Sequence, residues 1–162
     1  YGIEITDNYI HNIMNSKLYD GGAIYTNGLT GASVEDMNKI CRNYIQNQKM
    51  STGAIYNDEG SSFWQVSENV IDLSENSIWI MRNSDGSGYI SAPTAIFMNT
   101  VSAKNNKYFN NYATTDYAIF GKNSSITEAP LAFSCNEWPA EANLIIKKAG
   151  ITEKYRDNFT NK

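Results

Sequence analysis

The sequence predicts an all-β fold in which the chain winds into the stacked coils of a parallel β-solenoid and then forms one α-helix. Three observations support this prediction. The tetrapeptide Gly-Ala-Ile-Tyr occurs twice, at positions 22–25 and 53–56; asparagine recurs before short apolar stretches; and one late segment, 136–151, stands out as helical. Short β-branched and aromatic runs separated by Gly and Asn are typical of strands and turns.

The first half of the repeat contains an asparagine followed by a short apolar strand. The four asparagines are separated by 35, 26 and 37 positions, so the period varies while the order of strand, turn, strand and loop is kept. Variation of this kind fits a solenoid, in which loops absorb differences in coil length. Asparagine suits the turns, because it tolerates left-handed backbone and its amide can bond to the asparagine of the next coil. The residues are Asn8, Asn43, Asn69 and Asn106, in the segments 5–12, 40–47, 66–73 and 103–111.

The second half of the repeat is the tetrapeptide itself, with expected copies at 22–25, 53–56, 77–80 and 117–120. Alternate residues of a strand face opposite sides. The isoleucines should therefore point into the solenoid, and the aromatic residues that follow them should point outward. The expected inward residues are Ile24, Ile55 and Ile119, and the expected outward residues are Tyr25, Tyr56 and Phe120.

An antiparallel β-sandwich with accidental sequence similarity is the alternative fold. A sandwich does not need the same tetrapeptide in neighbouring strands, so the solenoid is favoured.

The segment 136–151 has the features of a helix that follows the coils. Pro139 suits a first turn, Lys147 and Lys148 suit the last turn, and Gly150 suits the end. The sequence thus divides into coils over residues 1–130 and a helix with a tail, packed on the solenoid, over residues 131–162. The expected apolar face of the helix consists of Ala142, Ile145, Ile146 and Ala149.

Charge and composition exclude some classes of function. The net charge of −4 and the pI of about 5.0 build no basic field, so nucleic acid is a poor partner. No apolar run is long enough for a membrane-spanning helix. One histidine, His11, makes a His-based zinc site implausible, and Cys41 and Cys135 could either pair or remain free thiols. The first residues already resemble the middle of a repeat, so we expect an incomplete first coil that an upstream portion or a companion chain completes.

The outward face of the two tetrapeptide strands is the expected functional site. Aromatic rings can stack on the apolar face of a sugar, and two carboxylates can cleave a glycosidic bond as acid and as nucleophile or base. An acid or Asn beside Gly is also an ordinary turn residue, but three acids beside outward tyrosines favour a site. The expected catalytic residues are Asp20, Asp58 and Glu59, and the expected substrate-binding residues are Tyr25, Asn27, Tyr56 and Trp64.

A resemblance to a known family adds to this prediction. The segments "DGGAIYTNG", "GAIYNDEGSSFW" with "ENVI", and "WPAEANLIIKKAGITEKYRD" together resemble bacterial right-handed parallel β-helix proteins. Many of these are glycoside hydrolases, including lacto-N-biosidase-like and xylanase- or fucosidase-like enzymes. The resemblance implies an oligosaccharide or polysaccharide partner, a secreted or cell-surface location, no obligatory cofactor or metal, and a catalytic pair at Asp20 and Asp58. Where such enzymes need an acid at position 27, this chain has Asn27.

Two other functions share the expected fold. A polysaccharide lyase would need Ca²⁺ and a basic residue near the acids, but the nearest cations, Lys17, Arg42 and Lys49, lie outside the expected strip. A non-catalytic carbohydrate-binding or adhesin module would keep the tyrosines and have no need of the acids. Loss of hydrolysis on removal of the acids would distinguish the hydrolase from such a module.

Overall fold

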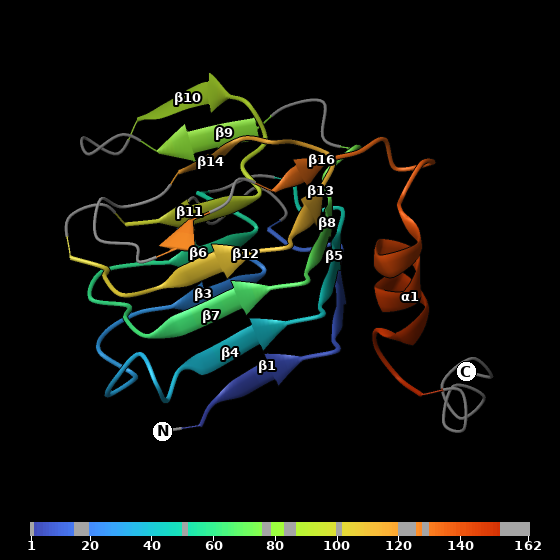
Figure 1. Cartoon of the computed structure of the whole chain (residues 1–162). Helices are drawn as coiled ribbons and strands as arrows, with labels where there is room; N and C mark the ends of the chain where they lie inside the picture. The colour runs from blue at the N-terminus through green and yellow to red at the C-terminus, as the bar shows by residue number, and fades with distance from the viewer. Residues whose placement is uncertain are drawn as a thin grey trace.

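The protein is mostly β-structure, in which one chain passes in turn through three parallel sheets, here named A, B and C. The computed structural model describes residues 2–14, 20–49, 52–75, 79–82, 87–99, 102–119, 126–127 and 130–152. Figure 1 shows the strands stacked in layers, with helix α1 beside sheet B. One passage through the three sheets is called a coil. The predicted all-β class with parallel strands is confirmed, and the antiparallel sandwich is excluded.

Sheets A and B have five strands each, and every pairing within them is parallel. Sheet A contains β1 (Glu4–Thr6), β4 (Asn38–Cys41), β7 (Trp64–Ser67), β12 (Lys107–Phe109) and β15 (Ile126–Thr127). Sheet B contains β2 (Tyr9–His11), β5 (Tyr44–Gln46), β8 (Val70–Asp72), β13 (Tyr112–Ala113) and β16 (Leu131–Ala132). The last strand of sheet B therefore lies beyond residue 130, where the sequence placed the end of the coils.

Sheet C carries the repeated tetrapeptide. Its four parallel strands are β3 (Ile24–Thr26), β6 (Ile55–Asn57), β11 (Ile96–Met98) and β14 (Ala118–Ile119). Between β8 and β11 the chain forms an antiparallel hairpin of β9 (Trp79–Arg82) and β10 (Gly88–Ser91).

The predicted third copy of the tetrapeptide is wrong, and the fourth copy lies in sheet C with its register displaced by one residue. Residues 79–80 of the expected copy 77–80 belong to the hairpin, and the strand that continues sheet C is β11, where Ile96 pairs with Ile55. In the next coil Ala118 pairs with Ile96 and Ile119 pairs with Phe97, so Ile119 takes the register of the tyrosines. Phe120 lies outside the described residues. The hairpin accounts for the error in the third copy, because it places another apolar strand before the true one.

The core lies inside the three sheets. Each central coil contributes an isoleucine or valine that is fully buried, and the predicted inward direction of Ile24 and Ile55 is confirmed by exposed fractions of 4% and 0%. Burying a side chain of this size contributes about 1.5 to 3 kcal/mol. The buried residues of the central strands are Ile40 and Val66 in sheet A, Ile45 and Ile71 in sheet B, and Ile55 and Ile96 in sheet C.

Glycine begins each tetrapeptide because the coils approach closely there. A Cβ atom on Gly22 would lie 2.5 Å from the carbonyl oxygen of Gly53. A Cβ atom on Gly53 would lie 2.8 Å from the Cβ of Phe97 in the following coil. No real Cβ tolerates these distances, so backbone packing between coils explains this part of the repetition.

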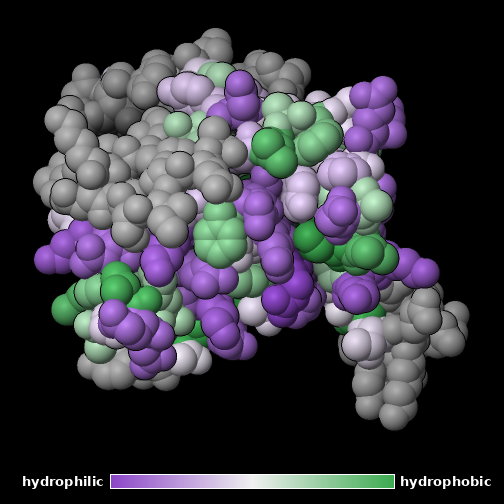
Figure 2. All heavy atoms as spheres, viewed as in Figure 1, coloured by the Kyte–Doolittle hydropathy of each residue, from purple (hydrophilic) through white to green (hydrophobic). Residues whose placement is uncertain are grey.

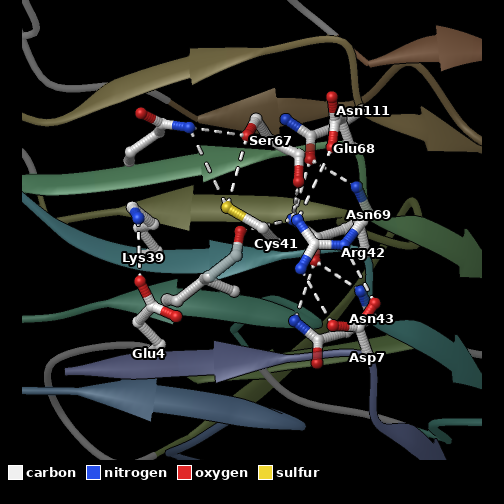
Figure 3. A network of polar contacts seen from close by, with 12 residues as sticks. Glu4, Asp7, Lys39, Cys41, Arg42, Asn43, Ser67, Glu68, Asn69 and Asn111 are labelled. Carbon is white, nitrogen blue, oxygen red and sulfur yellow. Dashed lines mark hydrogen bonds and ion pairs between the residues drawn. The ribbon is translucent and has the colours of Figure 1, made fainter. Parts of the chain in front are cut away.

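The corner between sheets A and B is built by a left-handed residue followed by asparagine. The left-handed residues have φ between 52° and 58°, and they are Asp7, Arg42, Glu68 and Asn110. The asparagines after them are Asn8, Asn43, Asn69 and Asn111, and each of the first three donates its backbone N–H and its Nδ2 to the Oδ1 of the next. Figure 3 shows three of these asparagines one above another. We name this column the corner ladder.

The predicted ladder position of Asn106 is wrong. Asn106 lies at the beginning of sheet A, where its Oδ1 accepts the backbone N–H of Trp64 at 2.9 Å. Asn38 performs the same role one coil earlier, for the backbone N–H of Ile3. The fourth member of the corner ladder is Asn111, which lies 42 positions after Asn69.

Charged side chains cover the same corner on the outside. Arg42 donates to both carboxylate oxygens of Asp7 at 2.9 Å and lies 4.0 Å from Glu68 (Figure 3). In Figure 2 hydrophilic side chains run down the middle of this face, and hydrophobic ones gather near the helix. These side chains are about half exposed, so the ion pairs contribute little to stability.

Helix α1 (Ala140–Lys148) lies along sheet B and contacts β8. Ala142 and Ala149 of the expected apolar face are buried, whereas Ile145 and Ile146 are half-buried. Gly150 ends the helix with φ of 87° and donates its N–H to the carbonyl oxygen of Asp7 at 2.8 Å. Within the described residues no helix is long and apolar enough to cross a membrane.

Candidate functional site

A column of aromatic rings runs across the outer face of sheet C. Tyr25, Tyr56 and Phe97 occupy the same register in three successive coils. Their ring centres are 5.2 Å and 5.1 Å apart, and neighbouring rings meet edge to face. The Tyr25 side chain is 44% exposed and Tyr56 only 6%. The predicted outward direction of both tyrosines is confirmed, but only Tyr25 presents its ring to solvent.

The residue two positions after each aromatic ring forms a second column at the end of the strands. Its members are Asn27, Asp58 and Asn99. Backbone pairing between the coils continues as far as this second column. The Asp58 N–H donates to the carbonyl oxygen of Thr26 at 2.8 Å, and the Asn99 N–H donates to the carbonyl oxygen of Asn57 at 2.8 Å. One carboxylate thus lies between two amide side chains in adjacent coils.

Both oxygens of the Asp58 carboxylate accept hydrogen bonds. The Tyr25 hydroxyl donates to Oδ2 at 2.6 Å, and the Asn99 Nδ2 donates to Oδ1 at 2.9 Å. Burial to 7% exposure by itself would raise the pKa of Asp58, but hydrogen bonds from Tyr25, Tyr56 and Asn99 and from the backbone of Glu59 outweigh it and lower the pKa. Asp58 is therefore held in its ionised form.

The two tyrosines are protonated donors to this carboxylate. The hydrogen bond to Asp58 is the main cause that raises the pKa of Tyr25, followed by partial burial. Burial is the main cause that raises the pKa of Tyr56, and the hydrogen bond to Asp58 adds to it. Asn27 lies beside Tyr25 and donates its Nδ2 to the Tyr25 hydroxyl at 3.2 Å. Asn27 thus acts on Asp58 through Tyr25.

Asp20 and Glu59, the other two predicted acids, are exposed. The charge of Asp20 contributes to the raised pKa of both Tyr25 and Tyr56, so Asp20 lies on the same side of the molecule. Glu59 follows Asp58 in the turn after β6, and its carbonyl oxygen accepts the N–H of Gly28 at 2.7 Å. The structure therefore groups five predicted residues around Asp58: Asp20, Tyr25, Asn27, Tyr56 and Glu59.

Trp64, the last predicted site residue, does not belong to this surface. Its side chain is 2% exposed and lies in the core at the beginning of β7 in sheet A. The reason is strand parity, because Trp64 and the inward Val66 lie two positions apart and face the same side. A substrate-binding role for Trp64 is therefore corrected to a core role.

Sequence reasoning missed Asn99 and Phe97. The signal that could have found them is the segment "TAIFMN" at 94–99, which repeats "GAIYND" at 53–58 with four substitutions. Thr94 replaces the initial glycine, Phe97 replaces tyrosine and Asn99 replaces the acid. The strand register shows that the two segments are equivalent.

A buried polar cluster fixes the backbone behind Asp58. The hydroxyl of Tyr108, a fully buried residue, donates to Oδ1 of Asn57 at 2.8 Å, and the Asn57 Nδ2 donates to the Thr26 hydroxyl at 2.8 Å. Ser61 completes the cluster, because its hydroxyl lies 2.9 Å from that of Thr26 and its N–H donates to the Asp58 carbonyl. Strand ends held by such bonds give Asp58 a defined position.

The site has the chemistry of an ionised acceptor beside an exposed ring. An ionised carboxylate can accept a ligand hydroxyl, act as a base or act as a nucleophile, whereas it cannot donate a proton. Among the residues that the structure describes, no three His, Cys, Asp or Glu side chains are placed to hold a metal ion. The described cysteines, Cys41 and Cys135, are both free.

Comparison with the profiles of protein families, with curated proteins and with solved structures found no match to this chain. The functional argument therefore depends on the structure itself. One chain passes through three parallel sheets, and the Asp58 carboxylate on the outer face of sheet C accepts hydrogen bonds from both neighbouring coils.

Proposed function

We propose that this chain forms coils of a right-handed parallel β-helix that acts on an oligosaccharide or polysaccharide as a glycoside hydrolase. The regular order of sheets A, B and C in the chain supports the β-helix, and the winding direction is part of the proposal. The outer face of sheet C supports the function, because an exposed aromatic ring adjoins an ionised carboxylate there.

The observation that carries the proposal is the state of Asp58. It is the one acid of the predicted three that the protein surrounds with donors, and these donors favour its charged form. In a two-carboxylate mechanism this residue is the nucleophile or the base. Asp20 or Glu59, which are both exposed to solvent, would supply the proton to the leaving oxygen.

The sugar is expected to stack on the exposed Tyr25 ring. A sugar hydroxyl that reaches Oδ2 of Asp58 would replace the Tyr25 hydroxyl as the donor, and Asn27 would remain as a partner for the displaced hydroxyl. Tyr25→Ala should then weaken oligosaccharide binding by about two- to tenfold or more, because aromatic contacts contribute about 0.5 to 1.5 kcal/mol beyond the area that they bury. Tyr25→Phe should retain most of the binding.

Hydrolysis is tested with soluble oligosaccharides such as xylohexaose and lacto-N-tetraose, by measuring released reducing ends. Asp58→Asn should reduce kcat by at least about 10³-fold while binding by calorimetry is kept, since the amide preserves size and removes the charge. Asp20→Asn and Glu59→Gln separate the two candidate proton donors. Glu137 is an exposed acid just before helix α1, so Glu137→Gln is the matched control and should leave kcat unchanged. Full activity in Asp58→Asn would reject the assignment.

A non-catalytic carbohydrate-binding module is the second candidate, and one observation favours it. Both oxygens of Asp58 already have protein donors, as expected of a carboxylate whose role is to orient Tyr25. In that case the unmodified protein binds the oligosaccharides without cleaving them, and Tyr25→Ala still loses binding. Release of reducing ends by the unmodified protein, lost in Asp58→Asn, excludes this candidate.

A further inference from the structure

The three members of the Asn27–Asp58–Asn99 column use their side chains differently. Asn27 donates its Nδ2 to the Tyr25 hydroxyl, within its own coil. Asn99 donates its Nδ2 across coils to Oδ1 of Asp58 at 2.9 Å. The carboxylate therefore has one donor from the preceding coil, Tyr25, and one from the following coil, Asn99.

These two donors differ in how firmly they are held. Tyr25 is 44% exposed, so its hydroxyl can exchange Asp58 for water or a ligand. Asn99 is half-buried, follows the fully buried Met98, and is fixed by its N–H bond to Asn57 at 2.8 Å. A donor with a fixed backbone orients its acceptor more firmly than an exposed side chain does.

We infer that Asn99 is a positioning residue for Asp58. Its amide holds Oδ1 and thereby leaves Oδ2, the oxygen on the side of the exposed Tyr25, for a ligand. The same bond favours the charged carboxylate, since a donor to the ionised form opposes protonation. The functional site thus extends over three successive coils, and the third coil contributes a residue that does not touch the substrate.

The test is a titration of Asp58 by ¹³C NMR of its side-chain carboxyl, which needs no substrate. Asn99→Ala should raise the titration midpoint of Asp58 by about one pH unit, as expected for the loss of one hydrogen bond to a charged group. Asn99→Asp places a second carboxylate at the same distance and should raise the midpoint further. Asn99→Ser, which keeps a small donor, provides a third variant if the alanine variant does not fold.

The matched control is Gln65→Ala on the outer face of sheet A. It removes a side-chain amide that donates to the Ser67 hydroxyl at 3.1 Å and should leave the midpoint of Asp58 unchanged. A midpoint in folded Asn99→Ala that equals the unmodified value, or a midpoint in Asn99→Asp that does not rise, overturns the inference.

The role of Asn99 in hydrolysis rests on the proposed function. If the protein is a hydrolase, the acidic limb of the kcat/KM profile in Asn99→Ala should move to higher pH by the same amount as the NMR midpoint, with KM unchanged. If the protein has no hydrolytic activity, the proposed function fails, but the NMR result still confirms or rejects the control of Asp58 by Asn99. The two failures are therefore distinguishable.

Discussion

The Oδ1 atom of Asn69 accepts two hydrogen bonds from Asn43 in the preceding coil, from the backbone N–H at 3.1 Å and from Nδ2 at 3.0 Å. Asn69 in turn donates to Asn111, and its Nδ2 also bonds to the carbonyl oxygen of Ile40. One fully buried amide therefore satisfies polar groups from three coils. It compensates for the left-handed backbone of Glu68 immediately before it.

Asn69→Ala should lower the free energy of unfolding by about 3 kcal/mol, because it leaves several buried donors and acceptors without partners. Asn8→Ala is the matched control in the same corner ladder. Asn8 is exposed, so water can replace its bonds, and the cost should stay below about 1 kcal/mol. Urea unfolding of the two variants checks the difference, and a loss below about 1 kcal/mol in Asn69→Ala would show that the ladder does not stabilise the corner.

Gly53→Ala should destabilise the protein by about 1 to 3 kcal/mol, a typical cost of overpacking. The added Cβ would lie 2.8 Å from the Cβ and 2.9 Å from the backbone nitrogen of Phe97, in the next coil. Thr52→Ser, at the neighbouring position, is the control and should change stability by less than about 0.5 kcal/mol. Thermal unfolding by circular dichroism measures both. Unchanged stability in Gly53→Ala would mean that the coils separate more easily than their packing indicates.

Asp58 should make the free energy of unfolding depend on pH in the acidic range. Its pKa is lowered in the folded state, so its contribution is fully present above the ordinary Asp pKa of about 3.9 and is lost as the pH falls through the lower folded value. The unmodified protein should therefore lose stability from about pH 5 downward. In Asp58→Asn this component should be absent and the slope below pH 5 shallower. Identical slopes in urea titrations would contradict the ionised state of Asp58.

Ala142→Leu should lower the free energy of unfolding by about 1 to 3 kcal/mol, because Ala142 is fully buried where helix α1 meets sheet B. Leu144→Ala tests the opposite side of the helix. Leu144 is 56% exposed, so its removal should change stability by less than about 0.5 kcal/mol. If Ala142→Leu were neutral and Leu144→Ala costly, the docked face of the helix would be the other one.

The sequence predicts the elements of this fold that depend on local pattern. The repeated tetrapeptide gives the register of sheet C in two coils, and the parity of Ile55 and Tyr56 gives their inward and outward directions. The end of the helix follows from Gly150, whose positive φ favours glycine. Each of these three features depends on a few residues that are close in the sequence, so the local pattern is sufficient to predict it.

The remaining features depend on which coils are adjacent, which sequence alone does not give. Asn99 and Asp58 are 41 positions apart in the sequence and bond to each other because their coils are adjacent. The inserted hairpin β9–β10 contains the end of the segment 77–80, which is therefore not the third copy of the tetrapeptide. The exposed fraction of Tyr56 depends on tertiary packing rather than on strand parity. The core position of Trp64 depends on where β7 begins, because only then is its parity with the inward Val66 defined.

The members of the corner ladder are separated by 35, 26 and 42 residues, yet each pair makes the same bonds at 2.9 to 3.2 Å. The number of residues between two neighbouring asparagines of the ladder thus has no effect on the hydrogen bonds that join their coils. The connection between sheets B and C can therefore vary in length, as the β9–β10 hairpin illustrates, while the bonds of the corner ladder stay the same. We expect related chains to differ most in length at this connection, and a foreign peptide inserted there should be tolerated.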